Sequence, residues 1–239
     1  MVLRLYFTTD FGKLHQHNPG IIEAALRVDR TPSAVAMKAG NFASLDPEIY
    51  RTGRKGLRGA SAADKHIWEE YQTDWNSLAA EAQKAWEESG SPPELEEGSP
   101  LPVGPTDSKE LVKVRRVQSF FRASVLANYE GKCAISGLPT PELLNASHII
   151  PWRVEESLRA DPTNGIALSA IHDRAFDRGF ISLDENLKVL VSSKLKSAEA
   201  NSFLRVSLLE MEGSKIRPPL RYLPAKRALE YHRDVVFVN

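Results

Sequence analysis

Three segments decide the fold of this chain: ASHIIPW at residues 146–152, DPTNG at 161–165 and HDRAFDRG at 172–179. They lie between Cys133 and Ser192, where imidazole, acidic and aromatic side chains recur at short intervals. Imidazole and carboxylate groups serve as metal ligands and as proton acceptors. We therefore expect this stretch to carry the chemistry of the protein, and not only a packed core.

The acidic residues of the last segment have the spacing of a helix-borne metal site. Asp173 and Asp177 stand four residues apart, so on a helix they share one face. Neighbouring carboxylates repel each other, and a bound cation turns that repulsion into attraction. Adjacent helix residues point about 100° apart, so we expect Asp177 to bind together with either His172 or Asp173. Surface pairing of the carboxylates with Arg174 or Arg178 fits the same pattern.

Composition bounds the protein class and the kind of metal site. The 239 residues are 42% hydrophobic, which is enough for a sizeable core. Cys133 is the only cysteine, which excludes an intramolecular disulfide and a zinc site of paired cysteines. Imidazole and oxygen ligands remain, and they suit one divalent ion without distinguishing Mg²⁺, Mn²⁺, Ni²⁺ and Zn²⁺. We find neither a leader nor an apolar run of membrane-spanning length, so we expect a cytoplasmic protein without a membrane partner.

Charge is balanced overall but unevenly distributed. Residues 1–59 carry a net +4, residues 60–109 a net −8 and residues 110–239 a net +4. This pattern permits nucleic-acid contact at both ends of the chain, although ordinary surfaces show similar offsets. Residues 90–108 are rich in Pro, Gly, Ser and acidic residues, which indicates a linker. We expect a helical domain over residues 1–89 and a second domain over 109–239.

The first domain contains a candidate DNA-recognition element. A helix is expected over Ile21–Val28, and Thr31-Pro32 supplies an N-cap and a first-turn proline for a second helix through Lys38. The tight turn at Asp29-Arg30 between them is typical of a helix-turn-helix. An ordinary helical hairpin fits the pattern equally well.

A basic, glycine-rich segment follows, and then a helical one. Glycines let the backbone approach a phosphate chain while cations neutralise it, and a solvated flexible connection is the alternative. We expect one helical stretch over Ala62–Glu88, whose aromatic residues pack a core. The candidate DNA contacts of the basic segment are Arg51, Arg54, Lys55 and Arg58.

The second domain is expected to begin with a helix from Leu111 to about Tyr129. A short strand and turn are predicted over Cys133–Gly137, and a hairpin over Ile181–Val191 that turns at Asp184–Asn186. A final helix is predicted near Ala225–Arg233.

From about Gln118 to Ser192 the chain resembles the HNH endonucleases, in the branch with the motifs FR...Y...C..SG, L..ASHI.PW and NG..L...HD..FD.G. The resemblance covers about a third of the chain, and its separated motifs agree in order. The matching residues are Phe121-Arg122, Tyr129, Cys133, Ser136-Gly137, Leu144, Ala146–Ile149, Pro151-Trp152, Asn164-Gly165, Leu168, His172-Asp173, Phe176-Asp177 and Gly179.

The resemblance implies an α+β protein whose second domain is a ββα nuclease fold around one divalent cation. It makes His148, near the end of the first strand, the general base. It gives Asn164 the task of bracing the loop between the strands and orienting that histidine. It assigns metal binding to the helix that carries His172, Asp173 and Asp177.

One residue departs from the family pattern. The position before the base histidine is often an Asp or His ligand, whereas this chain has Ser147, a poor ligand by itself. The resemblance further implies hydrolysis of phosphodiester bonds in double-stranded DNA, with Arg153, Arg174 and Arg178 as candidate phosphate contacts.

We expect a restriction-type endonuclease whose N-terminal domain selects the DNA site. Cleavage of both strands would favour a homodimer, because it requires two active sites. A catalytically inactive DNA-binding regulator and a non-specific nuclease toxin are the alternatives.

Overall fold

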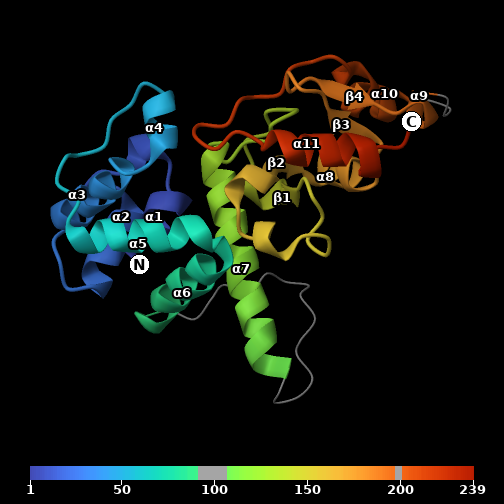
Figure 1. The fold of residues 1–239 in the computed structure, drawn as a ribbon. Coiled ribbons are helices and arrows are strands. Elements are labelled where there is room, and N and C mark those ends of the chain that lie inside the picture. The colour runs from blue at the N-terminus through green and yellow to red at the C-terminus, as the bar shows by residue number, and fades with distance from the viewer. Residues whose placement is uncertain (91–106, 197–200) are drawn as a thin grey trace. The chain divides into compact units, whose positions relative to one another are not determined.

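The computed structural model describes residues 1–90, 107–196 and 201–239 (Figure 1). The chain forms two compact units, Met1–Ser124 and Val125–Asn239. The described part of the first unit is helical and the second combines helices with two small sheets, so the predicted α+β class is confirmed. The expected linker, 90–108, lies almost wholly outside the described residues, and the predicted domain limits stay predictions.

Five helices of the first unit begin where a polar side chain satisfies free N–H groups of the first turn. The N-caps with such hydrogen bonds are Asn18, Thr31, Asp46, Ser61 and Asp74. The unit contains α1 (Val2–Thr8), the short η1 (Phe11–Lys13), α2 (Pro19–Arg27), α3 (Pro32–Ala43), α4 (Pro47–Arg51), α5 (Ala62–Thr73), α6 (Trp75–Glu88) and most of α7 (Asp107–Asn128).

The expected single helical stretch over Ala62–Glu88 is in fact two helices. Asp74 ends α5 with extended backbone angles (φ −148°, ψ 88°) and its side chain caps α6 by accepting from Asn76 and Ser77. A short acidic side chain that bonds to the backbone two and three residues ahead favours a cap over a helix interior. The apolar period alone does not reveal this break.

Aromatic packing forms the core of the first unit. The Phe7 ring stacks on Trp68 with 5.9 Å between ring centroids and meets Trp75 edge-on at 4.9 Å. The Tyr6 hydroxyl donates to Asp46 Oδ2 at 2.5 Å, and Tyr6 itself is buried. The aromatics of α5 and α6 therefore pack the core, as the sequence predicts. No described helix combines the length and hydropathy that crossing a membrane requires.

The second unit is built around a ββα motif. Strands β1 (Leu144–His148) and β2 (Gly165–Ser169) are antiparallel, and α8 (Ala170–Asp177) follows β2 directly and packs against both strands. β2 is buried along nearly its whole length. The register places His148 opposite Gly165. The predicted motif is present with the predicted order of elements.

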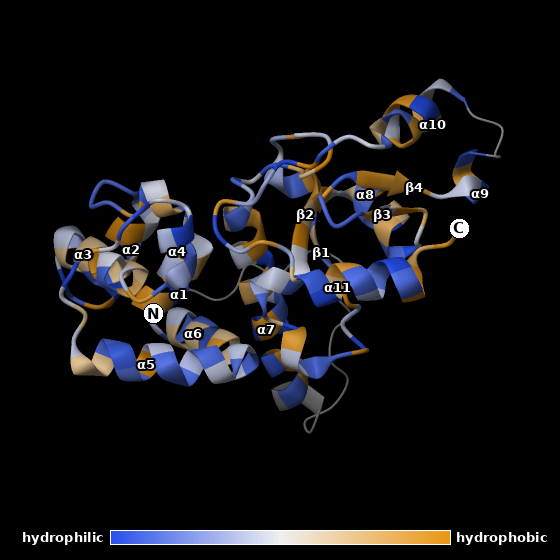
Figure 2. Cartoon of the chain, turned by 45° about the horizontal axis from the view of Figure 1, so that its top comes forward, coloured by the Kyte–Doolittle hydropathy of each residue, from blue (hydrophilic) through white to orange (hydrophobic). Residues whose placement is uncertain are grey.

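The remaining elements complete the second unit. The predicted hairpin is confirmed as β3 (Ile181–Leu183) and β4 (Val189–Val191), which is drawn in the hydrophobic colour in Figure 2. The others are η2 (Pro141–Leu143), η3 (Glu156–Leu158), η4 (Pro162–Asn164), α9 (Ser193–Lys196), α10 (Ser202–Ser207), η5 (Leu209–Met211), α11 (Lys226–Tyr231) and the π-helix η6 (His232–Val236).

Of the short strand and turn predicted over Cys133–Gly137, the turn is present and the strand is wrong. This segment is a turn, closed by a hydrogen bond from the Gly137 N–H to the Cys133 carbonyl at 2.9 Å. Gly137 adopts a φ of 73°, which turns the chain too soon for a strand to form. One backbone bond reaches the sheet, from the Ala134 N–H to the Ala167 carbonyl at 2.7 Å.

Gly179 ties the end of α8 to the C-terminal segment. Its φ is 70°, and a Cβ atom there would lie 2.0 Å from the carbonyl oxygen of Val236. The Gly179 carbonyl accepts from the Val238 N–H at 2.9 Å. Glycine is therefore required both for backbone conformation and for space.

We expect Gly179→Ala to lower the free energy of unfolding by about 2 kcal/mol or more, because it adds a collision to the left-handed strain. Gly137→Ala is the matched control, since its φ is 73° but no atom lies within 4 Å of the added Cβ. The control should lose only about 1 kcal/mol. Urea denaturation measures both, and equal losses would contradict this account.

Candidate active site

His148 is the last residue of β1, and its ring is oriented by the loop that follows. Its Nε2 lies 3.0 Å from the carbonyl oxygen of Arg159. A carbonyl oxygen only accepts, so Nε2 carries the proton and the ring's lone pair is at Nδ1. Trp152 meets the imidazole edge-on, with 5.5 Å between ring centroids.

The surroundings of His148 keep the ring neutral. Burial lowers the pKa of His148 below its ordinary value of 6.5, while the bond to Arg159 and the charge of Asp173 act in the opposite direction. Burial prevails because a charged imidazolium loses its hydration there. At neutral pH the ring is therefore in the form that accepts a proton.

Asn164 braces the loop between β1 and β2. Its Oδ1 accepts from the Ile150 N–H at 2.8 Å, and its Nδ2 donates to the carbonyls of Ile150 (3.1 Å) and Leu158 (3.4 Å). The side chain is buried. Leu158 directly precedes Arg159, whose carbonyl orients His148. Asn164 thus links the start and the end of this loop by hydrogen bonds.

Asp173 lies in the first turn of α8 and is held by two side chains of β1. Asn145 Nδ2 donates to its Oδ2 at 2.7 Å, and the Ser147 hydroxyl donates to its Oδ1. Asn145 and Ser147 are two residues apart on a strand, so they point to the same face. A carboxylate offers about four lone-pair positions, and both oxygens of Asp173 keep capacity for a further partner.

Asp177 lies one helical turn beyond Asp173. Partial desolvation and the charge of Asp173 raise the pKa of Asp177 to about 6, against the opposing effect of Arg174 and Arg178. The two carboxylates therefore interact electrostatically. Within the described residues, no salt bridge joins either of them to Arg174 or Arg178, both of which are exposed.

His172 points into the core. Its Nε2 lies 2.9 Å from the Ser207 carbonyl, and its Nδ1 lies 2.8 Å from Ser169 Oγ and 3.5 Å from Cys133 Sγ. The residue is only 5% exposed. Both ring nitrogens have partners within the fold, whereas Asp173 faces β1.

Cys133 is a hydrogen-bonding centre and not only an apolar packing residue. Its sulfur lies 3.2 Å from the Ser169 N–H and 3.4 Å from the Ser136 N–H. Burial opposes ionisation, but the hydrogen bonds from His172 and these groups outweigh it and lower the pKa of Cys133 to about 6. The pKa of His172 is raised, because contact with Cys133 outweighs burial. This cluster anchors the start of α8.

Ser147, Asp173 and Asp177 supply only oxygen donors, which suits a hard divalent cation such as Mg²⁺ or Mn²⁺. No group of three or more His, Cys, Asp and Glu side chains is arranged as a metal site among the described residues. The donor set that fits best is the pair of carboxylates, with the Ser147 hydroxyl hydrogen-bonded to Asp173.

The structure gathers part of the predicted set and adds to it. His148, Asn164, Asp173 and Asp177 come together on the ββα motif. Sequence reasoning did not identify Asn145 or the Arg159 carbonyl, although Asn145 precedes Ser147 by the two-residue period of a strand face. Arg153 is exposed on the loop after β1, and the four basic candidates Arg51, Arg54, Lys55 and Arg58 belong to the first unit.

Comparison with known families agrees with this geometry. Residues 133–184 match a family described as HNH endonuclease. The matched range contains β1, β2 and α8 and no part of the first unit. A search of curated proteins found no match for the chain. Over residues 133–184 of its second unit, this chain is thus similar to the HNH endonucleases.

Proposed function

We propose that this protein is a metal-dependent endonuclease that hydrolyses phosphodiester bonds of double-stranded DNA. The observation that carries the proposal is a neutral imidazole, His148, on the same ββα motif as two coupled carboxylates. The match of residues 133–184 to the HNH endonuclease family supports nuclease chemistry. We expect the protein to act in the cytoplasm, and as two copies where both strands are cut.

His148 acts as the general base. Its Nδ1 lone pair takes a proton from water, whose oxygen forms a new bond to phosphorus while the bond to the leaving 3′ oxygen breaks. The Arg159 carbonyl stabilises the imidazolium that results, because Nε2–H donates to it. Asn164 keeps this carbonyl in place through the loop and takes no part in proton transfer.

Asp173 and Asp177 are the residues that would hold the divalent ion. The ion supplies electrostatic stabilisation of the phosphate oxygens and of the leaving group. His172 is buried and both of its ring nitrogens have hydrogen-bond partners. This favours Asp173 over His172 as the second ligand beside Asp177. The oxygen-only donor set favours Mg²⁺ and Mn²⁺ over Ni²⁺ and Zn²⁺.

Ser147 assists Asp173 and does not replace it. Its hydroxyl donates to Asp173 Oδ1 while Asn145 donates to Oδ2. Such outer hydrogen bonds orient a metal-binding carboxylate. This arrangement favours an active enzyme over an inactive DNA-binding regulator, because serine at this position still serves the site.

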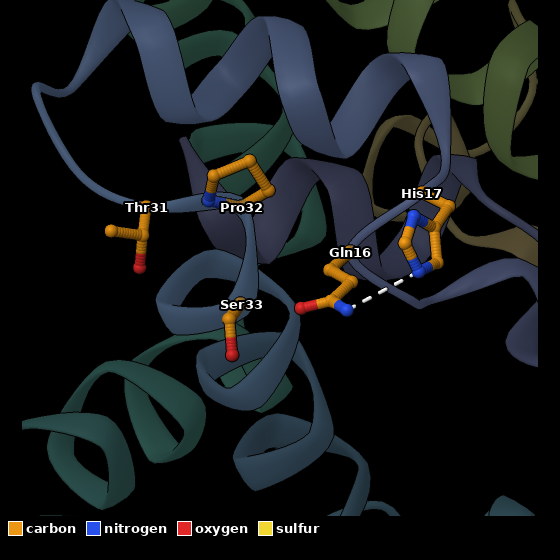
Figure 3. A pocket seen from close by; sticks show the side chains of 5 residues that line it. All are labelled: Gln16, His17, Thr31, Pro32 and Ser33. Atoms are coloured by element: carbon orange, nitrogen blue, oxygen red, sulfur yellow. Dashed lines mark hydrogen bonds between the residues drawn. The ribbon is translucent and has the colours of Figure 1, made fainter.

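The first unit offers features that support selection of a DNA site and a restriction role. Helices α2 and α3 are joined by a short turn in which Asp29 has a φ of 50°. A pocket of about 300 Å³ lies at the N-terminus of α3 (Figure 3), where a recognition helix meets base edges. Amide, imidazole and hydroxyl groups line it, and all can hydrogen-bond to DNA: Gln16, His17, Thr31 and Ser33, with Pro32 beside them.

We expect His148→Ala to reduce plasmid cleavage in Mg²⁺ or Mn²⁺ by about 100-fold or more, because the proton acceptor is lost. DNA binding should be unchanged. His66→Ala, which alters an exposed histidine of α5, is the control and should cleave normally. Cleavage by His148→Ala at the rate of the unaltered protein would refute the role of this residue.

We expect Asn145→Ala and Ser147→Ala each to weaken Mn²⁺ binding by about 10- to 100-fold, measured by calorimetry without DNA. Ser147→Thr keeps the hydroxyl and should bind almost normally. Asn186→Ala, in the exposed β3–β4 turn, is the control. If Asn145→Ala binds Mn²⁺ as tightly as the unaltered chain, Asp173 only ties α8 to β1.

A further inference from the structure

The segment between α4 and α5 is a docked loop and not a loose connection. The Leu57 N–H donates to the Gly40 carbonyl at 2.9 Å, and the Leu57 side chain packs on Gly40. Gly56 lies so close to α3 that a Cβ atom would be 2.0 Å from the Ser44 nitrogen. Any side chain at residue 56 would push the loop away from α3, so glycine sets its position.

This docked loop presents three cations to solvent. Arg54, Lys55 and Arg58 are all exposed, and none has a hydrogen bond or salt bridge to any residue that the structure describes. Arg54 lies over the Phe11 ring with 5.6 Å between the guanidinium carbon and the ring centroid. Arg51 differs, because it pairs with Glu48. Three of the four predicted cations therefore remain available to an external anion.

We propose that Arg54, Lys55 and Arg58 form a fixed phosphate-contact surface for the DNA backbone, whose position is set by Gly56. Their charges lie within five residues of one loop, and a phosphate chain presents closely spaced negative charges to such a cluster. Lysine and arginine at such sites position the duplex without reading its sequence. Another polyanion could bind the same three cations, and competition with heparin tests this alternative.

The location of the loop fits a duplex that also meets α3. The loop docks at the C-terminal end of α3, and the pocket lies at its N-terminal end. A helix of 12 residues spans about 18 Å, and the major groove is about 12 Å wide. One duplex can therefore meet both ends of α3, with bases at the pocket and flanking phosphates at the loop.

The proposal rests on DNA being the substrate, and its test is independent of cleavage. The full chain with His148→Ala, in EDTA, is titrated with a short unmodified DNA duplex at several salt concentrations. Arg54→Gln/Lys55→Gln/Arg58→Gln should bind about tenfold or more weakly, with the salt slope reduced by about 2 to 3. The control Lys65→Gln/Lys84→Gln removes exposed cations of α5 and α6. It should change the affinity and the salt slope much less than the triple variant does.

Gly56→Ala separates position from charge, since it leaves every cation in place but displaces the loop. It should weaken binding and reduce the salt slope as the triple variant does, whereas Gly12→Ala, with no atom near the added Cβ, should have no effect. Leu57→Ser loosens the same docking and replaces Gly56→Ala if that variant melts early. Normal binding by the loosened loop, or by the triple variant, would overturn the proposal.

A heparin fragment, added as competitor, tests the ligand class. The unaltered chain should prefer the duplex at equal charge, and a preference for heparin would overturn the assignment to DNA. If the duplex binds through the loop but is never cut with divalent ions, the proposed enzyme activity fails while this surface stands.

Discussion

The proposed active site depends on one short loop that offers two adjacent backbone carbonyls. Leu158 accepts from the amide of Asn164, and Arg159 accepts from His148 Nε2. The first bond fixes the loop and the second fixes the imidazole. Because a carbonyl never donates, the same contact decides which ring nitrogen carries the proton. The position of the proton on His148 therefore follows from backbone geometry.

The proposed metal ligand Asp173 is held by the strand that carries His148. Asn145 and Ser147 hold the two oxygens of Asp173, and His148 is the next residue of the same strand. Any shift of β1 along β2 by one residue would turn these two donors to the other face. The positions of His148 and of the Asp173 carboxylate are thus both determined by the register of β1 on β2.

Much of the second unit could be predicted from the sequence because its motifs are local. The ββα order, the β3–β4 hairpin and the place of His148 at a strand end follow from segments of a few residues. The Cys133 segment was misread because a five-residue turn and a short strand have the same apolar character. The break at Asp74 was missed because a cap interrupts a helix without interrupting its apolar period.

The partners of the site residues could not be predicted, because they depend on tertiary contacts. Sequence spacing left His172 and Asp173 as alternatives, and the preference for Asp173 in the proposed site comes from the burial of His172 and the hydrogen bonds at its two ring nitrogens. The role of Asn145 likewise appears only when β1 lies beside α8. The charges of the basic segment are visible in the sequence. The contact of Gly56 with α3, which positions them, is visible only in the structure.

The central claim is that His148 is neutral at pH 7 with its proton on Nε2. Nitrogen NMR of histidine-labelled protein measures this directly, and loss of the signal in His148→Gln identifies the residue. The account predicts a protonated Nε2 and an unprotonated Nδ1. A proton on Nδ1, or a fully charged ring at this pH, would contradict it.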